Sequence, residues 1–132
     1  MLTLLWVALG GALGTVARFG LNLAITARTG DLFPWGTLVI NIVGSFVIGL
    51  FATLTTIDGR LAVSADVRLF VLVGICGGFT TFSSFSLQTL ALIEAGQPLR
   101  AGLNVLASVA LCLLAVWAGS LAPALLSHPP RS

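Results

Sequence analysis

Apolar residues dominate four long stretches of the chain, and short polar segments separate them. The stretches run over about residues 2–27, 35–57, 69–95 and 101–126. A helix needs about 20 residues to cross the hydrocarbon core of a bilayer, and each stretch is long enough. The pattern therefore predicts four transmembrane helices. In the tail that follows, we expect His128 to be solvated rather than to act as a ligand.

The composition agrees with a membrane protein. Hydrophobic residues make up 58% of the chain, charged residues make up 8%, and the mean hydropathy is +1.12. A soluble domain of this size needs far more charge to cover its surface. The four stretches and their turns occupy residues 1–132, so we expect one all-α integral membrane domain. The basic residues are scattered, which is not the pattern of a nucleic-acid-binding protein.

Arginines in the loops indicate how the chain is oriented, because basic residues prefer the cytoplasmic side. With four spans, Arg60, Arg68 and Arg131 share one side of the membrane. Arg28 and Arg100 lie on the other side. Three against two is almost no bias, so the sequence predicts that both orientations occur.

The third stretch contains a segment that is not typical of a transmembrane helix, reading GGFTTFSSFS from Gly77 to Ser86. Adjacent glycines each destabilise a helix interior by about 1 kcal/mol. Short hydroxyl side chains compete for backbone hydrogen bonds. We expect an unwound turn from Gly77 to Thr81, with a kinked helix packed closely through glycine as the alternative. Carbonyls freed at such a break are suitable cation ligands.

Phe82 and Phe85 are three residues apart and therefore share a helix face. Such pairs usually serve packing. Here they lie beside Ser83, Ser84 and Ser86. Ring edges carry a partial positive charge, so they can also face an anion without exposing a cation.

The other three stretches also carry polar residues at membrane depth. They are Arg18 and Asn22 in the first stretch, Asn41 in the second, and Asn104, Ser108 and Cys112 in the fourth. Gly10 and Gly14 share the spacing of Arg18, and small residues at such steps allow helices to approach closely. An intramembrane charge indicates a functional site, although the Arg18 side chain could instead extend toward the membrane surface.

Asn and Ser side chains inside a membrane have two possible roles, which the sequence leaves open. They can donate hydrogen bonds to an ion, or they can join helices. Apart from Glu94 at the end of the third stretch, no acid lies near them. Neutral donors, phenyl edges and a buried arginine suit a small anion better than a cation.

These residues resemble the signature of the Fluc fluoride channels, also called the CrcB family. The resemblance rests on GGFTTFSSFS, on GALGTVARF in the first stretch and on PWGTLVINIVGSFVIG in the second, and it covers the whole chain in order. It implies a passive, fluoride-selective channel rather than an enzyme, which exports fluoride across a bacterial plasma membrane and so lowers cytoplasmic fluoride. It also implies an antiparallel homodimer of dual topology with two pores.

The resemblance also implies roles for individual residues. Backbone carbonyls of Gly77 and Thr80 would hold a structural sodium ion between the two broken third helices. We expect Gly78, Thr81 and Arg18 to act structurally or electrostatically. The fluoride pathway would comprise Asn41, Phe82, Ser83, Ser84, Phe85, Ser108 and Cys112.

Two features depart from the family pattern. Ser84 and Gln88 stand where the signature often has Thr and Glu, so a role that needs a charge at Gln88 is in doubt. Cys112 is a poorer hydrogen-bond donor than Ser or Thr.

Two other functions remain open from the residues alone. A small four-helix multidrug or cation exporter needs a titratable carboxylate inside the membrane, and the first two stretches contain none. A non-transporting scaffold needs only small-residue faces, and it leaves the Asn, Ser and Phe residues unexplained.

Overall fold

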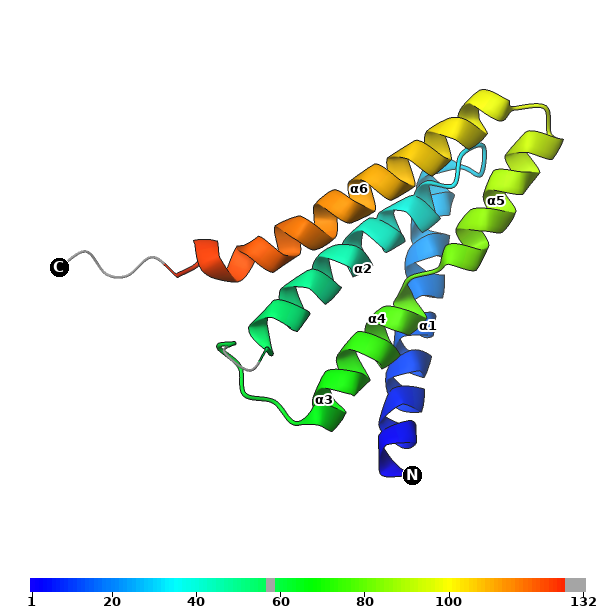
Figure 1. Ribbon diagram of the computed structural model, residues 1–132. Helices are drawn as coiled ribbons and strands as arrows, with labels where there is room; N and C mark the ends of the chain where they lie inside the picture. The colour runs from blue at the N-terminus through cyan, green and yellow to red at the C-terminus, as the bar shows by residue number, and fades with distance from the viewer. Residues whose placement is uncertain (57–58, 128–132) are drawn as a thin grey trace.

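The regular elements that the computed structural model describes are all helices, within residues 1–56 and 59–127 (Figure 1). They are α1 (Leu2–Thr29), α2 (Trp35–Leu54), α3 (Ala65–Leu69), η1 (Phe70–Ile75), α4 (Cys76–Phe79), α5 (Phe82–Glu94) and α6 (Pro98–Leu125). Elements α3 to α5 form one membrane-length span, and α1, α2 and α6 form the others. The prediction of four apolar spans is confirmed. Ile57, Asp58, His128 and Arg131 lie outside the described residues.

Local sequence signals set the helix ends. Gly30 and Gly96 have φ angles of 74° and 72° just after α1 and α5, a conformation that glycine adopts without strain. Pro98 occupies the first turn of α6, where its missing N–H leaves no bond unmade. The third span begins at Ala65, four residues before the predicted start, because the Ser64 side chain accepts a hydrogen bond from Val67 N and caps the helix.

Glycines allow the helices to approach closely, as the sequence predicts. A Cβ atom at Gly14 would meet the carbonyl oxygen of Ile75, and one at Gly78 would lie 2.5 Å from the carbonyl oxygen of Gly11. The first span therefore lies directly against η1 and α4. Figure 1 shows α2 and α6 side by side, and α5 packs against α6.

The third span bends at Thr80 and Thr81, which connect α4 to α5 (Figure 1). Their backbones are extended, with φ and ψ of −80° and 158° at Thr80 and −152° and 110° at Thr81. Gly77 and Gly78 were expected in an unwound turn, but both remain in α4. The helix continues past the glycines, and α1 packs directly against it at Gly78. Its C-cap is Thr80, because the next backbone N–H, that of Thr81, donates to Asn41 Oδ1 instead of to a helix carbonyl.

Candidate functional site

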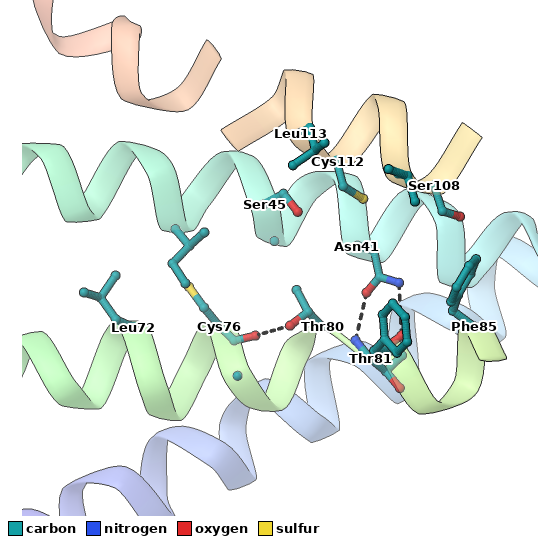
Figure 2. Close-up of a pocket in the computed structure, with 15 residues that line it drawn as sticks. Asn41, Ser45, Leu72, Cys76, Thr80, Thr81, Phe85, Ser108, Cys112 and Leu113 are labelled. Atoms are coloured by element: carbon teal, nitrogen blue, oxygen red, sulfur yellow. Dashed lines mark hydrogen bonds between the residues drawn. The ribbon is translucent and has the colours of Figure 1, made fainter. Parts of the chain in front are cut away.

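A cavity of about 460 Å³ lies beside the bend, between α2, the α4–α5 junction and α6 (Figure 2). We call it the Phe cavity. Among the residues predicted for the fluoride pathway, its lining includes Asn41, Phe82, Phe85, Ser108 and Cys112. Gly77, Thr80 and Thr81 line it as well. The fold therefore brings together predicted residues from three separate spans.

Asn41 holds the bend in place. Its Oδ1 accepts a hydrogen bond from Thr81 N at 2.8 Å, and its Nδ2 donates to Thr81 O at 3.1 Å (Figure 2). These two bonds satisfy backbone groups that the extended conformation has removed from the helix. The helix–helix role that the sequence left open for Asn41 is therefore observed, in a residue that also lines the Phe cavity.

Hydroxyl groups complete the junction. Thr81 Oγ1 accepts from Ser84 N at 3.2 Å and so caps α5. The same Oγ1 donates to Ser84 Oγ at 3.0 Å. Ser84 does not line the Phe cavity, and Ser83 lines none of the cavities described here. Both were predicted on the fluoride pathway. The structure therefore does not group either of them with Phe82 and Phe85 at the Phe cavity.

The two phenyl rings are in contact at one end of the Phe cavity. Their centroids are 5.2 Å apart and their planes are tilted by 52°. Phe85 is buried, whereas Phe82 is 76% exposed. Packing explains the position of Phe85, but most of the Phe82 ring is not covered by the described residues.

A second cavity of about 450 Å³ lies between α1, α2 and α5, and we call it the Arg18 cavity. Arg18, Asn22, Ser84 and Gln88 line it, and Thr81 lines both cavities. In the described part of the chain, Gln88 Oε1 is the one buried side-chain oxygen or nitrogen without a hydrogen-bond partner. Polar groups therefore lie on both sides of the bend.

Arg18 bonds to the backbone of α4, close to the bend. Its Nε donates to the carbonyl oxygen of Gly78 at 3.0 Å, and Thr15 Oγ1 donates to the same oxygen at 3.4 Å. This bond favours attachment of Arg18 to α4 over the alternative in which its side chain extends toward the membrane surface. Arg18 does not line the Phe cavity, which agrees with a structural or electrostatic role.

A buried network connects α5 and α6. Asn104, which is 1% exposed, donates from Nδ2 to Thr89 Oγ1 at 2.9 Å, and Thr89 Oγ1 donates to Phe85 O at 2.8 Å. Ser108 Oγ donates to Asn104 Oδ1 at 3.5 Å. Thr89 is not among the residues predicted from the sequence. Its spacing of four residues from Phe85 was the available signal.

Backbone oxygens at the bend differ in how they are bonded. The carbonyl of Gly78 accepts from Arg18, while those of Gly77 and Thr80 accept no hydrogen bond from residues 1–56 and 59–127. The described side chains contain no group of three His, Cys, Asp or Glu residues that could hold a metal. A cation at this position would therefore need neutral backbone oxygens.

Four apolar spans surround cavities lined by hydroxyls, amides, phenyl rings and one guanidinium. No carboxylate of the described residues lines the Phe cavity or the Arg18 cavity. These features define a multi-pass integral membrane protein with an intramembrane site suited to a small anion.

Comparison with known proteins identifies the family. Residues 5–120 match the family described as CrcB-like protein, Camphor Resistance (CrcB). The chain is 59% identical to the fluoride-specific ion channel FluC of Paramagnetospirillum magneticum, over 97% of this chain and 100% of the relative. It is 59% identical to that of Opitutus terrae, over 89% of both chains, and 56% identical to that of Methylocella silvestris, over 87% and 88%. The chain belongs to the CrcB family.

Proposed function

We propose that this protein is a passive, fluoride-selective channel that exports fluoride across the bacterial plasma membrane and so lowers its cytoplasmic concentration. The observation that carries the proposal is the Phe cavity, where Phe82, Phe85, Asn41 and Ser108 meet beside a bend in the membrane-spanning helix. Relatives that align with nearly the whole chain bear the name of fluoride channels, and this supports the same function here.

The chemistry of the Phe cavity suits fluoride. Fluoride is small and strongly hydrated, so a pathway must replace its lost water with hydrogen-bond donors. The Ser108 hydroxyl and the positive edges of the phenyl rings can do this. Because these groups are neutral, they stabilise the ion without holding it too tightly to leave.

Arg18 would add a fixed positive charge close to the pathway. No carboxylate of the described residues lines the cavity it occupies, so its charge is not neutralised there. A cation in a medium of low dielectric attracts anions over several ångströms. Its bond to Gly78 places this charge beside the bend.

A second, antiparallel copy would cover the exposed polar face of α5 and the end of α4. Gly77, Ser83 and Ser86 are exposed there, as is most of Phe82. Polar groups facing lipid are unfavourable, whereas small and hydroxylated residues favour contact between helices. The near-equal arginine count on the two sides supports a dimer of opposite orientations.

The free carbonyl oxygens of Gly77 and Thr80 fit a small, hard cation, and sodium is the one we propose. Two antiparallel copies would contribute two such pairs of oxygens. When bound, sodium would supply a positive charge at the centre of the dimer and stabilise the assembled form, because it binds that form alone.

Fluoride efflux from sealed vesicles, followed with a fluoride-selective electrode, tests the proposed function. Reconstituted protein should release fluoride down its gradient without a proton gradient. For a multidrug or cation exporter, transport would instead require exchange with protons or cations. For a scaffold, fluoride release would not exceed that of protein-free vesicles.

A further inference from the structure

The hydroxyl of Ser108 is held differently from those of Thr80, which lines the Phe cavity, and Thr89, which bonds to Phe85 O. Thr80 and Thr89 donate to the backbone carbonyls four residues earlier, at 2.9 and 2.8 Å. This is the ordinary arrangement for a hydroxyl on a helix. Ser108 donates instead to the side-chain oxygen of Asn104, at 3.5 Å. Its bond is therefore longer and is made to a different kind of acceptor.

Asn104 is fixed from the neighbouring helix. Its Nδ2 donates to Thr89 Oγ1 at 2.9 Å, and Thr89 is itself bonded to Phe85 O. Because the nitrogen end of the amide is committed to α5, the oxygen end is directed toward Ser108. Asn104 is 1% exposed and lines none of the four cavities described for this chain. It therefore acts on the Phe cavity only through its neighbours.

We propose, building on the fluoride-channel function, that Asn104 is a positioning residue that keeps the Ser108 hydroxyl available as an exchangeable donor. A hydrogen bond of 3.5 Å is at the outer limit of such bonds, so little is lost when the hydroxyl turns away from it. A bond to a charged acceptor is stronger than a neutral one. The hydroxyl can thus turn to an anion in the cavity and return to Asn104 when the anion leaves.

Replacing Asn104 with leucine removes both polar ends of the amide while keeping a branched side chain. The Ser108 hydroxyl can then donate to the backbone carbonyl of residue 104, in the same way as Thr80 and Thr89 donate to the carbonyls four residues before them. We expect the Asn104→Leu variant to release fluoride about tenfold more slowly than wild type, the size of effect of one hydrogen bond. Ser120→Ala is the matched control on α6, because among the described residues the Ser120 hydroxyl bonds to Trp117 O of its own helix and to no other helix. It should not change the flux.

A double variant separates positioning from a purely structural role. Thr89→Val combined with Asn104→Leu leaves no unpaired polar side chain in the network, so the thermal stability should recover. Positioning predicts that the flux of the double variant stays low although the protein is stable. Recovery of flux together with stability would overturn the proposal.

Ser108→Ala supplies the second test, as a double-mutant cycle. If Asn104 acts through Ser108, adding Asn104→Leu to Ser108→Ala should cause no further loss of flux. Independent, multiplying losses, or an unchanged flux in folded Asn104→Leu, would refute the positioning role. Wild-type vesicles that release no fluoride would overturn the channel function itself, so the two failures are distinguishable.

Discussion

At the scale of single residues, Asn41 combines two tasks. Its side-chain amide donates one N–H to Thr81 O and accepts a hydrogen bond from Thr81 N through its oxygen. An amide nitrogen carries two N–H bonds, so the second remains for a partner in the Phe cavity. The sequence leaves a hydrogen bond between helices as one of two roles for Asn41, and the structure shows that bond. The sequence could not identify Thr81 as the partner, because the two residues are 40 positions apart and only the packing of α2 against the bend brings them together.

The phenyl rings provide a residue-scale prediction. Phe82→Ile and Phe85→Ile each keep apolar bulk and remove the positive ring edge, so fluoride efflux from vesicles should fall by about tenfold. Trp117→Leu, an exposed aromatic on α6 outside the Phe cavity, is the control and should not change the efflux.

Chemical crosslinking should show that both isoleucine variants still form the proposed dimer. This control separates the loss of the ring edge from a loss of folding or assembly. If both variants released fluoride at the wild-type rate, Phe82 and Phe85 would serve packing alone.

At the scale of elements, the four spans follow from hydropathy alone, and the close packing of α1 follows from the spacing of Gly10 and Gly14. The position of the bend does not. Helix propensity favours a break at the glycines, yet the lack of a side chain at Gly78 is what allows α1 to lie directly against the helix there. The interruption falls at Thr80 and Thr81, where tertiary hydrogen bonds compete with the helix. Propensity is a weak signal when packing opposes it.

The adjacent glycines should respond differently to substitution. A Cβ atom at Gly78 would lie 2.5 Å from the carbonyl oxygen of Gly11, whereas at Gly77 it meets nothing within 4 Å. Gly78→Ala should therefore reduce the free energy of unfolding by about 1–3 kcal/mol, because the added methyl group overpacks the contact with α1. The measurement is a lower melting temperature than that of the wild-type protein. Gly77→Val should leave the fold of the single chain intact.

The proposed sodium site gives Gly77 a separate effect. Gly77→Val should weaken dimerisation and remove its dependence on sodium, measured as dimer fraction in sodium and in sodium-free buffer. Equal dimer fractions in both buffers for the wild-type protein would contradict a structural sodium ion.

At the scale of the whole molecule, one chain leaves the polar face of α5 uncovered. The proposed antiparallel dimer requires chains in both orientations. With Ser127→Cys, a membrane-impermeant maleimide should label about half of the chains in intact cells and the rest only after permeabilisation. Wild type, whose Cys76 and Cys112 lie within spans, controls for background labelling. Label that reaches position 127 from one side only would exclude dual topology.

The central claim is passive selectivity for fluoride, and paired efflux from one preparation of vesicles tests it most directly. Vesicles loaded with equal concentrations of potassium fluoride and potassium chloride are diluted into a buffer that contains neither fluoride nor chloride. A potassium ionophore carries the compensating charge, and no proton gradient is imposed. Ion-selective electrodes then follow both anions. The account predicts rapid fluoride release that requires the ionophore, with chloride retained as in protein-free vesicles. Release of both anions at similar rates, or fluoride release only when a proton gradient is imposed, would contradict it.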